Sequence, residues 1–213
     1  MANLIFDYDG TLHDCIKIYA PAFRLAYSYL VSLGVADKRE WSVGEISRWL
    51  GFSAKDMWNS FMPELPKSLK EECSKIIGDE MIHLVAEGKA QLYPHTLKVL
   101  KKLKDDGHTL IFLSNCKHSY MDAHINQFHL NNYFSGFYCS EDFDFKEKYK
   151  IFKNIKREYK GEFIVIGDRF QDMEIGEKHG VKAIGCSYGY GDLDELKYAE
   201  RIAFKISDIP RCI

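Results

Sequence analysis

The sequence predicts an α/β fold: a doubly wound parallel sheet with a helical insertion after its first strand. Four short apolar runs have polar or turn residues at both ends, as strands buried on both faces of a parallel sheet do. These runs are residues 4–6, 110–113, 163–166 and 181–184. From about Tyr93 onward, helical periodicity fills the gaps between them. Such alternation of strand and helix is typical of the Rossmann-like, doubly wound architecture.

Two helices of this α/β part can be located from their apolar stripes. Leu97, Leu100 and Leu103 share one face of a helix that we expect to end at Gly107. A second stripe precedes the apolar run at residues 163–166. It consists of Ile151, Phe152, Ile155 and Tyr159. Both stripes predict helices that cover the sheet.

The segment between the first two strands has a different character. From about Cys15 to Gly88 its pattern is helical, with no convincing strand. The first two strands are thus separated by roughly seventy residues, far more than an ordinary crossover needs. We expect an α/β catalytic core made of residues 1–14 and 87–213, and a helical cap made of residues 15–86. Long insertions over the functional ends of strands often act as lids.

The composition argues against several classes of protein. The chain has 29 Lys and Arg against 31 Asp and Glu, so its net charge of −2 gives no basic footprint for nucleic acid or an anionic membrane. There is no long apolar run, and the N-terminus lacks the pattern of a secretion signal. The six cysteines are scattered without a CxxC pair, which favours a reducing compartment. We expect a soluble cytoplasmic protein; its oligomeric state stays open.

Polar side chains follow three of the predicted strands, at the end where open α/β sheets bind their ligands. Asp7 and Asp9 follow the first strand in "LIFDYDGT", and Ser114 follows the second in "IFLSNC". Asp168 and Asp172 come after the third, in "FIVIGDRFQD". An isolated Asp or Ser often serves only in a turn or a helix cap, but here three strand ends agree. Carboxylates that meet at one edge of a sheet call for a cation, a shared proton or solvent exposure.

In this order and spacing, the motifs resemble those of the haloacid dehalogenase-like hydrolase superfamily, in its phosphatase branch. The motif DxDGT is matched by residues 7–11, the Ser or Thr that ends an apolar strand by Ser114, and GDxxxD by residues 167–172. The likeness covers essentially the whole chain. "LYPHTLKVLKKLKDDGHTLIFLSN" and "AIGCSYGYGDLDEL" are similar to segments of phosphoglycolate-phosphatase-like members. The resemblance implies an enzyme that hydrolyses a small phosphorylated metabolite.

The resemblance also implies roles for the residues that match the motifs. Asp7 would attack phosphorus and form an aspartyl-phosphate, which splits one difficult displacement into two easier ones. Asp9 would protonate the leaving alkoxide and later deprotonate the attacking water. Ser114 would donate a hydrogen bond to a phosphoryl oxygen. The remaining residues expected around the phosphate are Gly10, which suits a tight turn, Thr11 and Asn115.

A hard divalent cation would make four carboxylates beside a phosphate tolerable, and Mg²⁺ is the natural choice for oxygen ligands. By resemblance, its ligands are the Asp7 side chain, the Asp9 backbone carbonyl, Asp168 and, through a water molecule, Asp172.

The family also requires a lysine that bridges the nucleophile and the phosphoryl group. The segment "FDFKEKYKIFKNIKREYKG" offers several, and no proline marks the position. If Phe152 matches the apolar residue that lies six positions after the family's lysine, then Lys146 is the residue, with Lys148 as the alternative. The later lysines and Arg157 are expected on the solvated face of a helix.

The helical insertion contains candidates for substrate contact. By resemblance, "RWLGFSAKDMW" corresponds to a specificity loop, which singles out Arg48, Gly51 and Lys55. The aromatic residues nearby are expected to form mainly the core of the insertion itself. They are Trp41, Trp49, Phe52, Trp58 and Phe61.

Two positions depart from the family pattern. Arg169 follows the GD of the last motif, where many relatives have Ser or Thr, and either folds over the acidic cluster or lies on the surface. His13 stands just after the first motif, and we expect it to be an exposed spectator rather than a substrate contact. For His118, His124 and His129, surface positions are expected as well, because their spacing does not suit a metal site.

Several functions share this constellation. A sugar phosphomutase or a pyrophosphatase would use the same core residues. A haloacid dehalogenase is disfavoured because that branch lacks the second aspartate, which is present here as Asp9, and needs no metal. A non-enzymatic binding module is disfavoured because every acidic position is intact. The sequence therefore predicts a Mg²⁺-dependent phosphatase, with phosphoglycolate as the default substrate.

Overall fold

The computed structural model describes all 213 residues, and the chain forms two compact units. One unit consists of residues 1–14 and 92–213, and the other of residues 15–91. The second boundary therefore follows Gln91, a few residues later than the one expected at residue 86.

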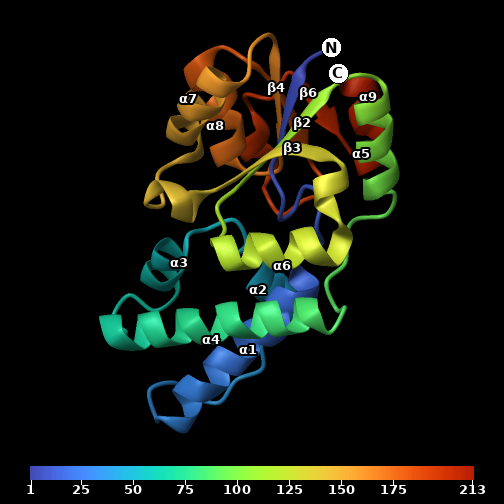
Figure 1. Ribbon diagram of the computed structural model, residues 1–213. Coiled ribbons are helices and arrows are strands. Elements are labelled where there is room, and N and C mark those ends of the chain that lie inside the picture. The colour runs from blue at the N-terminus through green and yellow to red at the C-terminus, as the bar shows by residue number, and fades with distance from the viewer. The chain divides into compact units, whose positions relative to one another are not determined.

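The first unit contains a six-stranded parallel sheet with the strand order β3-β2-β1-β4-β5-β6 (Figure 1). The strands are β1 (Asn3–Phe6), β2 (Thr109–Ser114), β3 (Phe134–Cys139), β4 (Phe163–Gly167), β5 (Lys182–Cys186) and β6 (Arg201–Ala203). This order confirms the doubly wound fold, in which the chain turns back beside β1 and then extends the sheet in the opposite direction. The reversal lies between β1 and β4, where such sheets bind their ligands.

The central strands are those that the apolar runs predicted, whereas the two edge strands, β3 and β6, were missed. Strand β3 reads FSGFYC and is only partly buried along its middle, so it lacks the continuous apolar signal of a central strand. Strand β6 has three residues and is too short to stand out in the sequence. Short edge strands are common because a long exposed edge invites pairing with other chains.

The helices of this unit are α5 (Thr96–Asp105), α6 (His118–Phe128), α7 (Lys148–Glu158), α8 (Phe170–His179) and α9 (Ile209–Cys212). Four short 3₁₀-helices occur at Leu130–Asn132, Ser140–Phe143, Leu193–Leu196 and Ile206–Asp208. Helices α7 and α8 lie on one side of the sheet, and α5 and α9 lie on the other (Figure 1). Both predicted helices are present, and α5 ends just before Gly107, whose φ of 87° is easily adopted only by glycine.

The core beneath α7 follows from two periodicities. Alternate residues of the strands face it: Ile5 of β1, Ile111 and Leu113 of β2, Phe163 and Val165 of β4. The apolar stripe of α7 meets them with Ile151, Phe152 and Ile155, each fully buried. Phe152 also packs edge-on against Phe163, with 5.2 Å between the ring centroids. This packing fixes the rotation of α7 about its own axis.

The second unit is helical and contains α1 (Ile16–Ser32), α2 (Val43–Ser47), α3 (Ala54–Phe61) and α4 (Lys67–Ala86). Ser42 and Ser53 cap α2 and α3 by accepting backbone N–H bonds. Its core is rich in aromatic rings: Phe61 packs against Phe23, Trp41 and Trp58. The expectation that most of these aromatics form the unit's own core is confirmed, although Phe52 is 41% exposed. None of the helices has both the length and the apolar character needed to cross a membrane.

Replacing Phe152 by alanine should lower the free energy of unfolding by about 3–5 kcal/mol, because it leaves a cavity between α7 and the sheet. Urea denaturation followed by circular dichroism measures the change. Phe204→Ala is the matched control, since that ring is 74% exposed. Equal losses in the two variants would contradict the assignment of Phe152 to the core.

Candidate active site

The loop after β1 is a tight turn built around one carbonyl group. The backbone oxygen of Tyr8 accepts the N–H groups of Thr11, Leu12 and His13, at 3.2, 2.8 and 3.0 Å. Gly10 has a φ of 88°, and a Cβ atom there would lie 2.2 Å from a carboxylate oxygen of Asp168. Glycine is therefore required at this position both for its backbone angles and for the space that it leaves.

Strand register brings the candidate residues to one edge of the sheet. Phe6 pairs with Phe112 on one side and with Ile166 on the other. Ser114 and Asp168 each lie two residues beyond those partners, at the same end as the turn that holds Asp7. Ser114 is buried and Asn115 is half-buried. The expected convergence of the strand ends is thus present in the fold.

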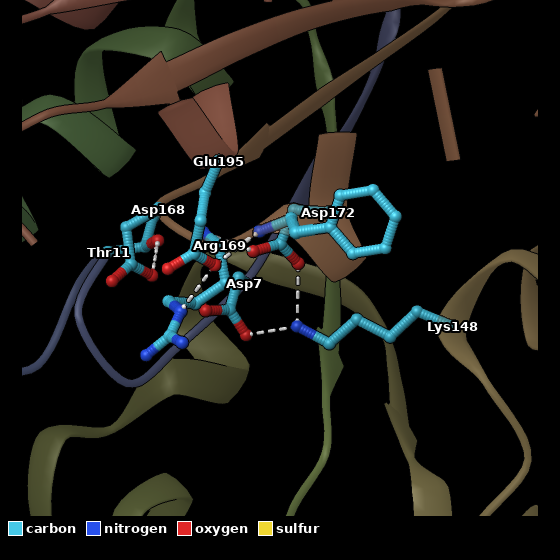
Figure 2. Close-up of polar contacts among 8 residues, drawn as sticks. Asp7, Thr11, Lys148, Asp168, Arg169, Asp172 and Glu195 are labelled. Carbon is cyan, nitrogen blue, oxygen red and sulfur yellow. Dashed lines mark hydrogen bonds and ion pairs between the residues drawn. The ribbon is translucent and has the colours of Figure 1, made fainter. Parts of the chain in front are cut away.

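Lys148 forms the central ion pairs of the site. Its Nζ lies 2.5 Å from Asp7 Oδ1 and 2.7 Å from Asp172 Oδ1, and all three side chains are buried (Figure 2). Asp172 Oδ2 accepts the backbone N–H of Arg169 at 3.1 Å, which fixes the first turn of α8 beside it. One lysine therefore links the loop after β1 to the start of α8.

The placement of Lys148 corrects the sequence-based choice of Lys146. The Lys146 side chain is 58% exposed, and its Nζ lies 3.7 Å from Asp144, away from Asp7. Lys148 begins α7, so it lies three and four residues before Ile151 and Phe152, on the same buried face. The apolar stripe of α7 indicates which lysine faces the core, because Lys148 shares its spacing. Counting six positions back from Phe152 indicates Lys146 instead.

Asp168 is held by groups from two different loops. Thr11 Oγ1 donates a hydrogen bond to its Oδ1 at 3.2 Å, and the backbone N–H of Tyr190 donates to its Oδ2 at 2.7 Å. The loop after β5 reaches this point because the Tyr188 hydroxyl donates to the Thr11 carbonyl at 2.8 Å. A Cβ atom on Gly189 would lie 2.3 Å from Asp168 Cβ.

The loop after β5 was not identified from the sequence as part of the site. Its signal is present in "SYGYG", where Gly189 stands between two tyrosines shortly after an apolar run ends. A glycine at such a point often marks a close approach of backbone to another group.

Arg169 is buried rather than lying on the surface. Its Nε donates to Glu195 at 2.9 Å, and Glu195 also accepts the backbone N–H of Phe170. Of the two positions expected for Arg169, the structure therefore supports the one close to the acidic cluster. Burial raises the pKa of the Asp168 carboxyl group, and the positive charge of Arg169 offsets only part of that rise.

Three carboxylates, Asp7, Asp168 and Asp172, have oxygen atoms within 4.8 Å of one another. Burial raises the pKa of Asp7 well above its ordinary value, and the charge of Asp172 adds to this effect. For the same two reasons the pKa of Asp168 rises to about 6. Burial favours the neutral form of Lys148, but the charges of Asp172 and Asp7 outweigh it and raise the pKa of the lysine. The cluster therefore holds more negative charge than its single lysine neutralises.

This donor set fits a hard divalent cation. The three side chains offer only oxygen atoms, which suit Mg²⁺ and exclude the soft metals that prefer sulfur. The raised pKa values of Asp7 and Asp168 mark the place where an additional positive charge would be most stabilising.

Asp9 has a different environment from Asp7, although one residue separates them. His13 Nδ1 lies 2.7 Å from Asp9 Oδ1, and the Tyr120 hydroxyl donates to the same oxygen at 2.8 Å. Burial alone would raise the pKa of Asp9, but the hydrogen bond and the charge of His13 outweigh it, so the pKa lies below its ordinary value. Proton donation by Asp9 would leave an anion that two donors already stabilise.

The expectation that His13 is an exposed spectator is wrong, since its side chain is fully buried. His124 is also fully buried, contrary to the surface position expected for it. Its pKa falls to about 3, mainly because burial disfavours the charged ring and also because His13 lies close by. The sequence analysis did not single out Tyr120. Tyr120 lies one turn before His124 on α6, and only the packing of this helix shows that it reaches Asp9.

The remaining candidates, Arg48 and Lys55, lie in the helical unit, where both side chains are exposed. Gly51 follows α2 with a φ of 85°. Their contact with a substrate stays a prediction.

Comparison with known proteins agrees with this fold. The family model for haloacid dehalogenase-like hydrolases matches residues 4–186. A phosphoglycolate phosphatase of Vibrio vulnificus is 25% identical over 203 residues, which cover 92% of this chain and 88% of the relative. A solved structure of a predicted phosphatase from Clostridium acetobutylicum has a TM-score of 0.82 and 20% identity, covering 99% of this chain and 96% of that one.

A variant of CbbY from Rhodobacter sphaeroides, solved with xylulose-(1,5)-bisphosphate, has a TM-score of 0.78 and 16% identity, covering 98% and 96% of the two chains. The chain belongs to the haloacid dehalogenase-like hydrolase family. Within it, the chain is a phosphatase-type enzyme, similar to the phosphoglycolate phosphatases.

Replacing Lys148 by methionine should reduce phosphate release at least about 100-fold, because a charge that offsets Asp7 and a phosphoryl oxygen is lost. Lys146→Met is the matched control and should retain nearly wild-type activity, since Lys146 is exposed. Steady-state assays on folded proteins test this. A large loss in the Lys146 variant with little loss in the Lys148 variant would reverse the assignment.

A divalent cation should stabilise the protein more at pH 7.5 than at pH 4.5. The pKa of Asp168 is raised to about 6 in the fold, so its burial destabilises the metal-free protein progressively as the pH rises from about 4 through 6. At a Mg²⁺ concentration of 100 times the Kd, binding should add about 2.7 kcal/mol to the free energy of unfolding. Thermal unfolding with Mg²⁺ and with chelator measures this, and Asp168→Asn should abolish most of the difference. An equal response at both pH values would contradict the prediction.

Proposed function

We propose that this protein is a Mg²⁺-dependent phosphomonoesterase that acts on a small phosphorylated metabolite through an aspartyl-phosphate on Asp7. The observation that carries the proposal is the contact of Asp7 with Lys148 inside a cluster of three buried carboxylates. The buried Lys148 beside Asp7 suits a carboxylate nucleophile, since its positive charge reduces the repulsion of an approaching phosphate dianion.

In the first step, an oxygen of Asp7 attacks phosphorus while the ester P–O bond breaks. Asp9 gives its proton to the leaving alkoxide oxygen. In the second step, Asp9 takes a proton from water, whose oxygen attacks phosphorus and releases Asp7 and inorganic phosphate. Lys148 stays charged throughout and offsets the negative charge that gathers between Asp7 and the phosphoryl oxygens.

The residues suited to hold Mg²⁺ are Asp7, Asp168 and Asp172, together with the carbonyl oxygen of Asp9. When bound, the cation supplies positive charge that offsets the carboxylates and the phosphate. Ser114 and Asn115, at the end of β2, together with Gly10 and Thr11 in the turn, are the proposed phosphate-binding residues. The buried positions of Ser114 and Thr11 at the same edge of the sheet support this assignment.

Phosphoglycolate is the first substrate to test, because the relatives that cover most of the chain bear that activity in their names. A sugar phosphomutase and a pyrophosphatase remain the alternatives with the same core chemistry. We further propose that the unit of residues 15–91 acts as a cap that excludes water and selects the substrate, with Arg48 and Lys55 as contacts. None of the six cysteines forms a disulfide, and we propose a reducing cytoplasm as the compartment.

Phosphate release from a panel of phosphoglycolate, sugar phosphates, nucleoside monophosphates and pyrophosphate should depend on Mg²⁺ and stop with chelator. Asp7→Asn should lower it by a factor of at least about 1,000, since the amide cannot form the phospho-enzyme. The Lys146→Met protein, purified in the same way and expected to be active, is the control for the purification procedure. Release that survives in the Asp7→Asn protein would rule out this nucleophile. Conversion of a sugar phosphate to its isomer without phosphate release would instead favour the mutase.

A further inference from the structure

The carboxylate of Asp9 is held through one of its two oxygens. Both of the contacts described above, from His13 Nδ1 and from the Tyr120 hydroxyl, reach Oδ1. The two donors come from different segments, the turn after β1 and helix α6. An ionised carboxylate only accepts hydrogen bonds. The Tyr120 hydroxyl and His13 Nδ1 are therefore both donors to ionised Asp9. Oδ2 is left available on a side chain that is 23% exposed.

The donors themselves are locked by ring packing. The His13 ring stacks on Tyr8 at a centroid distance of 5.2 Å and an interplanar angle of 12°. The neutral His124 ring lies against both donors, 4.5 Å from His13 and 4.3 Å from Tyr120. The Tyr8 hydroxyl in turn lies 2.6 Å from His124 Nδ1. A buried set of four rings therefore fixes where the two hydrogen bonds point, independently of the lysine and carboxylate cluster.

We propose that His13 and Tyr120 are positioning residues that anchor Oδ1 of Asp9, so that the proton exchanged with the leaving group and with water is carried on Oδ2. The proposal rests on the proposed phosphatase function. As the ester P–O bond breaks, the proton on Oδ2 moves to the alkoxide oxygen of the leaving group. As the water oxygen then bonds to phosphorus, a proton of that water moves to Oδ2. Oδ1 accepts two hydrogen bonds at every stage.

Anchoring matters because proton transfer depends steeply on position. A displacement of about 1 Å can cost about 100-fold in rate, and general acid–base catalysis contributes about 10²–10⁴-fold in all. A carboxylate without these donors could rotate about its side-chain torsions and exchange the roles of its two oxygens. Loss of one donor should therefore reduce proton transfer without altering how the phosphoryl group is bound.

The test exploits the leaving group. p-Nitrophenolate departs without a proton, whereas the alkoxide of an alkyl phosphate requires one. Tyr120→Phe should slow phospho-enzyme formation from phosphoglycolate, or from the alkyl phosphate that the wild type hydrolyses fastest, about 10-fold or more. Formation from p-nitrophenyl phosphate should slow only about twofold, and KM should stay unchanged for both. Rapid-quench measurement of the first turnover separates this step from the hydrolysis that follows.

Tyr159→Phe is the matched control, because its hydroxyl donates to the Ser135 carbonyl at 3.1 Å, outside the ring set. It should behave as the wild type with both substrates. Equal slowing of the two substrates by Tyr120→Phe, or no slowing at all, would overturn the proposal. If the wild type releases no phosphate from any substrate, the proposed function itself fails, which is a different outcome.

His13 gives an independent test through a conservative replacement. His13→Asn can keep an N–H donor near the position of Nδ1, whereas His13→Leu cannot. The Asn variant should retain first-turnover rates within about threefold of the wild type, and the Leu variant should lose at least about 10-fold with the alkyl phosphate. Thermal unfolding checks that both are folded, and Tyr120→Phe stands in if the Leu variant is not. Equal rates in the Asn and Leu variants would mean that His13 contributes only packing.

Discussion

The site depends on one constraint: three buried carboxylates lie together, and the one lysine among them contacts only two. Burying an unpaired carboxylate is costly, and removal of one partner from such a pair leaves an uncompensated charge. Lys148 between Asp7 and Asp172 makes the arrangement tolerable, and the raised pKa values of Asp7 and Asp168 show that the compensation is incomplete. A cluster built in this way favours the binding of a further cation. The free energy spent on burying the carboxylates is then partly recovered when the cation binds.

The scaffold positions this cluster with elements that have no chemistry of their own. Parallel register aligns the ends of β1, β2 and β4, while the stripe of α7 sets the rotation that directs Lys148 inward. Gly10 and Gly189 let the turns after β1 and β5 approach Asp168 more closely than any side chain would allow. Packing in the core beneath α7 is therefore coupled to the electrostatics of the site at the sheet edge.

How far the sequence could predict this arrangement depended on the kind of contact. Asp7, Ser114 and Asp168 lie at the carboxyl ends of strands, and these ends converge in any parallel sheet, so their meeting could be predicted. The choice between Lys146 and Lys148 depended on where α7 begins, and the helix stripe decides that better than motif spacing. His13 and Tyr120 are 107 residues apart. Their meeting on Asp9 depends on how α6 packs, which no local pattern encodes.

The most informative contrast in the molecule lies between Asp7 and Asp9. One residue separates them, yet burial and neighbouring carboxylates raise the pKa of the first, while the donors on Oδ1 lower the pKa of the second. The two neighbouring carboxyl groups are therefore chemically distinct, although they follow the same strand. Asp7, which Lys148 contacts at 2.5 Å inside the cluster of carboxylates, is placed for the covalent role that we propose for it. Asp9 accepts two hydrogen bonds on Oδ1, which leaves Oδ2 for the proton exchange that we propose.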